Sequence, residues 1–196
     1  MRAGMDSIRY RRRLSTDRHI QNLALVGFMG VGKSTVGRQL ANELEFEFVD
    51  TDEIIEERTG MPISEIFAKH GEAAFRDLER KLIEEMKEWH GKVIATGGGL
   101  VAQPGNLDAL KESALVVCLW AGPDTIHNRT KHQSHRPILQ TEDPEAKIRE
   151  LLAEREPFYK QADLLISTEL RPVREIAGNV AHHFRKTQEG NGTNES

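Results

Sequence analysis

The chain has little cysteine and no long apolar run. Cys118 is the one cysteine among 196 residues, which excludes an internal disulfide and a metal site built from several cysteines. No apolar stretch approaches the ~20 residues that span a bilayer, and no signal-like apolar core lies near the start. The net charge of -4 excludes an overall positive potential that would attract the chain to nucleic acid or to a membrane. We therefore expect a cytoplasmic monomer without nucleic-acid or membrane partners.

Both ends of the chain have the composition of tails. Residues 1–20 are rich in arginine and contain little that could pack in a core, so they predict a disordered N-terminal extension. A nucleic-acid arm or a targeting peptide is the alternative for this segment. Residues 188–196 are polar and predict a disordered tail. The remaining residues, 21–187, have the length of a single domain.

From residue 22 onward, short apolar runs alternate with helical patterns. Strands are expected at residues 23–26, 46–50, 93–96, 114–120 and 164–166. Helices are expected at residues 33–44, 52–58, 64–69, 72–90, 143–160 and 172–187, with one more after Trp120. Strands separated by such helices predict a three-layer α/β/α fold around a parallel, five-stranded sheet. Ligands of these sheets bind at the carboxyl ends of the strands.

The run Gly27-Phe28-Met29-Gly30-Val31-Gly32-Lys33-Ser34 fits the pattern G-x-x-x-x-G-K-S between an expected strand and an expected helix. Glycines let the backbone turn its N–H groups toward phosphates. Lys33 adds a positive charge over the β- and γ-phosphates, and the Ser34 hydroxyl suits Mg²⁺. The alternative, a chance glycine turn with a surface lysine, is disfavoured by the flanking elements. The motif predicts ATP as a ligand.

Asp50 and Asp52 flank the end of the second expected strand. Because side chains of a strand repeat every two residues, both carboxylates can face the same side of the sheet edge. One can hold Mg²⁺ while the other accepts the proton of an attacking hydroxyl. The alternative is a helix start, where aspartate is a favoured N-cap. The phosphate loop one helix upstream favours the catalytic interpretation for at least one of them. The histidines form no metal-ligand pattern, so no transition metal is expected.

Gly97-Gly98-Gly99 ends an expected buried strand, where three glycines are entropically costly unless a ligand approaches the backbone closely. This segment therefore indicates a second ligand. Arg76 lies in a helix among Glu72, Glu79 and Arg80, and charged residues of this kind usually form a solvated face.

Residues 129–137 are basic and lack periodicity, which predicts a mobile loop. Arginines on such a loop can close over phosphates and neutralise the charge that develops in transfer, although a solvated basic loop fits the spacing equally well. Arg155 and Tyr159 lie one turn apart on an expected helix. They fit either a helix-surface pair or a substrate clamp, and the spacing does not decide between these.

Taken in order, these motifs resemble the shikimate kinase family over about residues 23–177. The motifs that carry the resemblance are the phosphate loop with Thr35, Phe48-Val49-Asp50-Thr51-Asp52, Phe75-Arg76-Asp77-Leu78-Glu79, Ala95-Thr96-Gly97-Gly98-Gly99, Arg136-Pro137-Ile138-Leu139 and Arg155-Glu156-Pro157-Phe158-Tyr159. Each is short, but their order and spacing are highly specific. The resemblance implies a P-loop kinase fold like that of nucleoside-monophosphate kinases, with a substrate-binding region at about residues 52–92 and a short lid at about residues 130–141.

The resemblance also implies an activity, which is the transfer of phosphate from ATP to the 3-hydroxyl of shikimate, on the way to chorismate and aromatic amino acids. The residues implied to bind shikimate are Asp52, Arg76, Gly98 and Arg155. The residues implied to bind ATP are Gly30, Val31, Gly32, Lys33, Ser34, Thr35, Arg129, Arg136 and Arg171. Asp52 would accept the hydroxyl proton, Lys33 and Arg136 would stabilise the γ-phosphate, and Ser34 with Asp50 would organise the cofactor Mg²⁺.

The expected lid departs from the family pattern. Gln133 stands where the family often has an acidic residue, and Ile138 is a mild change from leucine. His132 and His135 give the hypothesis that lid closure is pH-sensitive. The rival functions are another small P-loop kinase, such as a gluconate or nucleoside-monophosphate kinase, and a P-loop module that binds ATP without catalysis. The retained Lys33, Asp52 and Arg136 disfavour the second rival.

Overall fold

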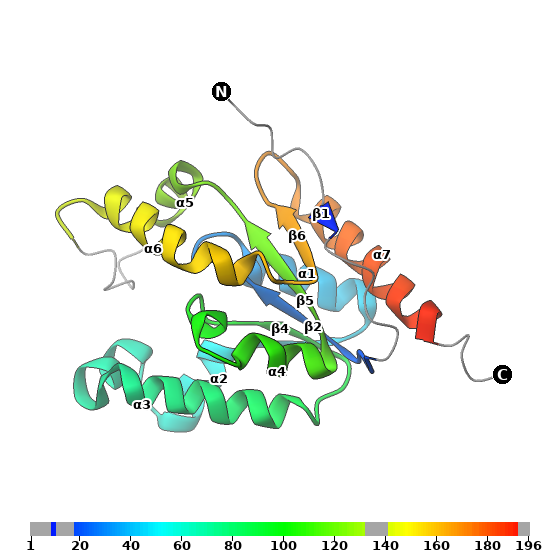
Figure 1. The fold of residues 1–196 in the computed structure, drawn as a ribbon, viewed down its shortest axis with the longest axis horizontal. Coiled ribbons are helices and arrows are strands. Elements are labelled where there is room, and N and C mark those ends of the chain that lie inside the picture. The colour runs from blue at the N-terminus through cyan, green and yellow to red at the C-terminus, as the bar shows by residue number, and fades with distance from the viewer. Residues whose placement is uncertain (1–8, 11–17, 132–140, 192–196) are drawn as a thin grey trace.

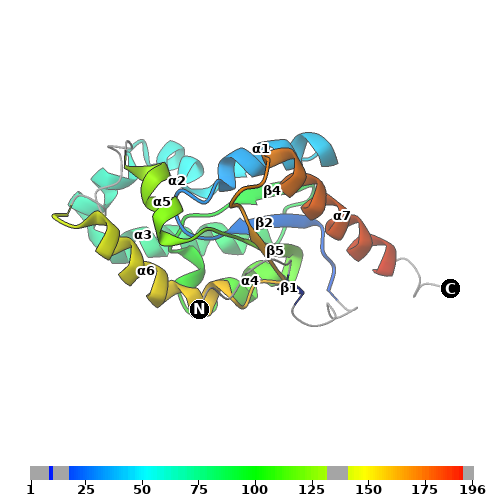
Figure 2. The same cartoon turned by 90° about the horizontal axis from the view of Figure 1, so that it is seen from above.

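One sheet lies between two layers of helices in the computed structural model, which describes residues 9–10, 18–131 and 141–191 (Figure 1). Figure 2 shows α1 (Lys33–Leu44) and α7 (Val173–Asn191) on one face of the sheet. The same view shows α4 (Asn106–Ser113) and α6 (Pro144–Tyr159) on the other face. The predicted three-layer α/β/α fold is confirmed.

The sheet has the strand order β1-β6-β5-β2-β4-β3. Its strands are β1 (Arg9–Tyr10), β2 (Asn22–Val26), β3 (Glu47–Asp50), β4 (Lys92–Ala95), β5 (Ala114–Trp120) and β6 (Leu164–Ser167). Strands β2 to β6 pair in parallel, as predicted for a five-stranded sheet. The short strand β1 adds an antiparallel edge next to β6. The sequence gives no sign of β1, because two residues are too few to show a period.

Described residues on both sides of the expected domain, 21–187, have regular structure or contacts with it. Arg18, expected to lie in a disordered extension, donates to both carboxylate oxygens of Asp163 at 2.8 and 3.2 Å. It also donates to the carbonyl oxygens of Lys111 and Ala114 at 2.6 and 2.7 Å. At the other end, α7 continues to Asn191 instead of ending at residue 187. The anchoring of Arg18 depends on a partner 145 positions away, and no local pattern encodes such a contact.

The helices agree with the expected ranges, with two short additions, α4 and η1 (Leu100–Ala102). The region of about residues 52–92 contains α2 (Thr51–Thr59) and α3 (Ile63–Met86). Gly71 interrupts α3 with a φ of 77° and a ψ of 171°, as the two expected helices on either side of it predict. The helix expected after Trp120 is α5 (Pro123–Thr130). The helix α4 and the 3₁₀ turn η1 (Leu100–Ala102) were not predicted.

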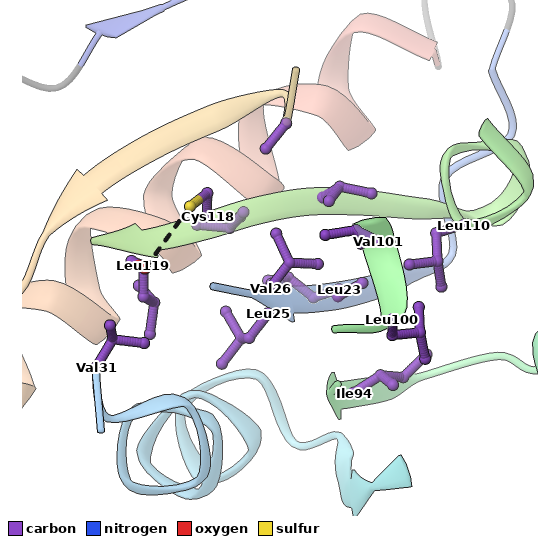
Figure 3. Close-up of a cluster of buried hydrophobic side chains, with 14 of the residues drawn as sticks. Leu23, Leu25, Val26, Val31, Ile94, Leu100, Val101, Leu110, Cys118 and Leu119 are labelled. Atoms are coloured by element: carbon purple, nitrogen blue, oxygen red, sulfur yellow. Dashed lines mark hydrogen bonds between the residues drawn. The ribbon is translucent and has the colours of Figure 1, made fainter. Parts of the chain in front are cut away.

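Apolar side chains of the central strands form the core. Figure 3 shows Leu23 and Leu25 of β2, Ile94 of β4 and Leu100 of η1 among the buried side chains of this core. Each fully buried leucine or isoleucine contributes roughly 1.5–3 kcal/mol. Cys118 of β5 lies in the same core, where burial raises the pKa of its thiol to about 12. It is therefore an inert apolar residue, as predicted.

Parallel strands bring their carboxyl ends to one edge of the sheet. The phosphate loop follows β2, Thr51 follows β3, and the triple-glycine segment follows β4 (Figure 1). The chain runs from β2 to one side of the sheet and later returns to the other side of β2, and ligands of such folds bind at this crossover. No helix within residues 18–131 and 141–191 has both the length and the apolar composition of a membrane span.

Candidate active site

The phosphate loop wraps tightly between β2 and α1. Gly27, Gly30 and Gly32 have φ angles of 135°, 75° and 98°, a region that side chains disfavour. A Cβ added to Gly27 would also collide with the carbonyl oxygen of Leu119. The Lys33 ammonium donates to the carbonyl oxygens of Gly27 and Phe28 at 2.9 and 3.0 Å, so its charge is held over the loop. This geometry is that of a phosphate cradle at a helix N-terminus.

A pocket of about 460 Å³ opens beside the phosphate loop. It is lined by Gly30, Val31, Gly32, Lys33, Ser34, Thr35, Val36, Arg129, Thr168, Arg171, Val173 and Ile176. Every ATP-binding candidate within the described ranges therefore faces the same cavity. Val173 and Ile176 supply an apolar wall that suits the face of a nucleotide base.

Arg129 connects three segments of this pocket. Its guanidinium donates to the hydroxyl and the carbonyl oxygen of Thr168 at 3.0 and 2.9 Å. It also lies 3.3 Å from the Gly30 carbonyl oxygen and 3.5 Å from that of Val31. The segment after β6 is thereby fixed to the phosphate loop through one side chain of α5. No sequence pattern singles out Thr168, because it lies 39 positions from the arginine that contacts it.

The first aspartate of the acidic pair serves two structural roles. One carboxylate oxygen of Asp50 accepts the backbone N–H of Asp52 at 3.1 Å, which caps α2. The other accepts the hydroxyl of Ser34 at 2.9 Å. The helix-start interpretation and the metal interpretation are thus compatible, because the two candidate Mg²⁺ ligands already lie side by side. In the described part of the chain, no group of three or more His, Cys, Asp or Glu could hold a metal ion. Mg²⁺ in kinases needs fewer protein ligands, since water and phosphate supply the rest.

Three charged side chains converge on the triple-glycine segment. A Cβ on Gly97 would lie 2.7 Å from Asp52 Oδ1, and a Cβ on Gly99 would lie 3.0 Å from an Arg76 nitrogen. At Gly98 the corresponding position is 3.7 Å from Arg155 Nη1 and 3.4 Å from the backbone nitrogen of Met29 in the phosphate loop. The glycines therefore bring the backbone against these side chains and against the phosphate loop.

Arg76 lies in a largely buried ion pair, which the solvated-face interpretation did not predict. Its guanidinium contacts Glu79 Oε2 and Glu72 Oε1, both at 2.7 Å, and its side chain is 14% exposed. Glu79 is fully buried. Burial raises the pKa of the Glu79 carboxyl; Arg76 opposes this effect and the Asp52 charge adds to it. Arg80, by contrast, is 65% exposed and fits a solvated face.

Comparison with known proteins shows the family of this chain. The family model described as shikimate kinase matches residues 29–185. The chain belongs to the shikimate kinase family. A shikimate kinase of Thermodesulfovibrio yellowstonii is 44% identical over 171 residues, which are 87% of this chain and 99% of that protein. One from Halorhodospira halophila is 47% identical over 157 residues, 80% of this chain and 89% of that protein.

Solved structures agree with this family. The shikimate kinase from Acinetobacter baumannii in complex with shikimate matches with a TM-score of 0.81 and 39% identity, over 86% of this chain and 95% of that chain. A gluconokinase from Sinorhizobium meliloti 1021 matches with a TM-score of 0.62 and 16% identity, over 91% of this chain and 99% of that chain. The second likeness shows a shared fold alone.

Four of the residues expected in the lid of this shikimate kinase family member, Arg136, Gln133, His132 and His135, lie outside the described residues.

Two residues that contact the site, Glu79 and Thr51, were not expected there from the sequence. Thr51 accepts the Gly97 N–H at 2.9 Å and is fully buried. Both lie inside motifs that carry the resemblance: Thr51 is next to Asp52, and Glu79 is one helical turn after Arg76.

Proposed function

We infer that this chain transfers the γ-phosphate of ATP to the 3-hydroxyl of shikimate, giving shikimate 3-phosphate and ADP. The observation that carries this inference is the close approach of the triple-glycine segment to the phosphate loop. The backbone of Gly98 lies against Met29 of the phosphate loop, and Asp52, Arg76 and Arg155 surround the same glycines. A donor site and a second charged site therefore share one wall, as direct phosphoryl transfer requires.

The second site suits an acceptor that has one carboxylate and several hydroxyls. Two guanidiniums, of Arg76 and Arg155, fit a carboxylate with paired hydrogen bonds. The carboxylates of Asp52 and Glu79 offer acceptors for hydroxyl groups. Among the described residues, Glu79 Oε1 has no hydrogen-bond donor although it is buried, and it lies 3.1 Å from the Cβ position of Gly97. A buried carboxylate oxygen of this kind calls for a donor, which a ligand hydroxyl or a water would supply.

Each charged group has a role in the transfer. Asp52 accepts the proton of the attacking 3-hydroxyl, so that the oxygen can bond to the γ-phosphorus while the bond to the bridging oxygen of ADP breaks. Lys33 balances the charge on the transferred group, and Arg136 of the lid adds a second positive charge. Arg129 and Arg171 hold the nucleotide at the pocket beside the phosphate loop.

Ser34 and Asp50 would hold Mg²⁺. Their oxygens, 2.9 Å apart, are a hydroxyl and a carboxylate, which are hard ligands of the kind that this ion prefers. When bound, Mg²⁺ neutralises charge on the β- and γ-phosphate oxygens. The monomeric state and the cytoplasmic location stay predictions of the sequence, as do the domain limits.

Two substitutions separate the donor site from the acceptor chemistry. Asp52→Asn removes the proton acceptor, and we expect turnover to fall by roughly 10²–10⁴-fold while ATP affinity changes little. Lys33→Met should lower both turnover and ATP affinity, since it removes the charge over the phosphates. Turnover is measured as ADP release with saturating shikimate, and affinity by calorimetry with MgATP.

Exposed residues supply matched controls for both substitutions. Asp77→Asn removes a carboxylate that is 59% exposed on the surface of α3, and Lys69→Met removes an ammonium that is 59% exposed on the same helix. Both controls should keep wild-type turnover. An Asp52→Asn enzyme within threefold of wild-type turnover would disprove the role of Asp52 as the proton acceptor.

A further inference from the structure

Side chains from three different helices hold the triple-glycine segment and Leu100, the residue after it. Thr51 at the start of α2 accepts the Gly97 N–H at 2.9 Å. Tyr159 at the end of α6 donates its hydroxyl to the Gly98 carbonyl oxygen at 2.6 Å. Asn106 at the start of α4 donates to the Leu100 carbonyl oxygen at 2.9 Å. A glycine-rich backbone has no side chains of its own to hold it, so these contacts fix its conformation together with backbone hydrogen bonds from Leu100 and Ala102 to Gly97 and Gly99.

Tyr159 makes the middle contact, at the glycine that lies between Arg155 and the phosphate loop. Tyr159 is 1% exposed, and its ring forms an edge-to-face pair with that of Trp120 at a centroid distance of 6.5 Å. Burial raises the pKa of the Tyr159 phenol, against the opposing charge of Arg155. The hydroxyl is therefore protonated at neutral pH and donates a hydrogen bond.

The position of Tyr159 on α6 ties this contact to substrate binding. Residues four apart on a helix lie on the same face, so Tyr159 and Arg155 project toward the same segment. The helix α6 thus supplies both a guanidinium for the acceptor and the donor that fixes the backbone on which the acceptor lies. In a trans peptide, the Gly99 N–H points opposite to the Gly98 carbonyl, so the Tyr159 contact also fixes the direction of that N–H.

We propose that Tyr159 is a positioning residue for shikimate, acting through the Gly98–Gly99 peptide and not through the nucleotide. The proposal rests on the proposed function, since it assigns Tyr159 to the acceptor side of that reaction. The pocket that faces the nucleotide has no contribution from Tyr159 or from the triple-glycine segment. Loss of the hydroxyl should therefore weaken the acceptor site and leave the nucleotide site as it was.

Tyr159→Phe tests this with the removal of one oxygen atom. The ring keeps its packing against Trp120, while the buried Gly98 carbonyl loses its donor. We expect the KM for shikimate to rise about 10-fold, the size of effect that follows from a lost buried hydrogen bond, and the KM for ATP to stay within about twofold. Thr51→Val removes the contact on Gly97 and should give the same split.

Ser113→Ala is the matched control. Its hydroxyl also donates to a backbone carbonyl, that of Met86 at 3.4 Å, but Ser113 is the last residue of α4, directly before the amino end of β5 and on the opposite edge of the sheet. This variant should keep both KM values of the wild type. A purely structural role of Tyr159 would lower the melting temperature of Tyr159→Phe and leave both KM values unchanged.

Three results are informative. An unchanged shikimate KM in Tyr159→Phe, or an equal rise of both KM values, overturns the proposal while wild-type turnover still supports the kinase assignment. A wild-type protein without shikimate-dependent ADP release overturns the proposed function, and with it the proposal. A selective rise of the shikimate KM, with faster amide hydrogen exchange at residues 97–99, supports both.

Discussion

Gly97→Ala, which adds a single methyl group, should slow phosphoryl transfer without weakening the binding of ATP. The added Cβ would lie 2.7 Å from Asp52 Oδ1 and 3.1 Å from Glu79 Oε1. The Asp52 carboxylate must therefore move by about 0.7 Å to reach the 3.4 Å of ordinary van der Waals contact. Gly97 has no positive φ, so alanine changes the contact without straining the backbone.

The size of the effect follows from that displacement. A misplacement of about 1 Å at a reacting group costs roughly 100-fold in rate, so we expect kcat of Gly97→Ala to fall by about 10- to 100-fold. The ATP pocket does not include Gly97, and the KM for ATP should stay close to the wild-type value. Steady-state ADP release at saturating shikimate measures kcat, and a titration of ATP measures KM.

Gly178→Ala is the control for this substitution. Gly178 lies in α7, and nothing lies within 4 Å of the Cβ that alanine would add. This variant should keep wild-type kcat and gain about 0.5–1 kcal/mol of stability, because alanine favours a helix over glycine. If Gly97→Ala folds and keeps kcat within twofold of the wild type, the placement of Asp52 against the triple-glycine segment is refuted as the source of the catalytic geometry.

Two further predictions concern Arg129 and Glu79. Arg129→Ala removes charged hydrogen bonds to Thr168 and to the phosphate loop, so the KM for ATP should rise about 10-fold, whereas the exposed control Arg80→Ala should leave it unchanged. The pKa of Glu79 is raised above its ordinary 4.5, so the protonated carboxyl stabilises the fold at low pH and this contribution is lost as the pH rises through the raised pKa. The free energy of unfolding of Glu79→Gln, measured with urea, should therefore increase relative to that of the wild type as the pH rises from 4.5 to neutrality. A difference that does not change with pH would contradict a raised pKa for the buried Glu79 carboxyl.

Much of the fold and of the donor site could be predicted from the sequence because local patterns encode them. The strand before Gly27, the glycines of the phosphate loop and the helix after Lys33 form one contiguous signal. The acidic pair likewise follows the end of a strand, but a two-residue strand period does not place Asp52, because α2 begins at Thr51 and Asp50 caps it. The parallel sheet then follows from the alternation of strands and helices.

The acceptor side was harder to predict from residue patterns. Helical periodicity could not separate the buried pair of Arg76 and Glu79 from the exposed Arg80, since all three lie on one helix and differ only in what packs against them. Only the resemblance to the family assigned Arg76 to shikimate. Strand β1 and the anchoring of Arg18 depend on contacts distant in sequence, which local propensity does not encode.

The choice of acceptor is the central claim, and ADP release from MgATP with a panel of acceptors tests it most directly. Shikimate, quinate, gluconate and AMP are offered to the purified, folded protein, and the phosphorylated product is identified by ³¹P NMR. We predict that shikimate gives the highest kcat/KM by a wide margin and that the phosphate is on its 3-hydroxyl. Absence of shikimate-dependent ADP release, or a higher kcat/KM with another acceptor, would contradict the account.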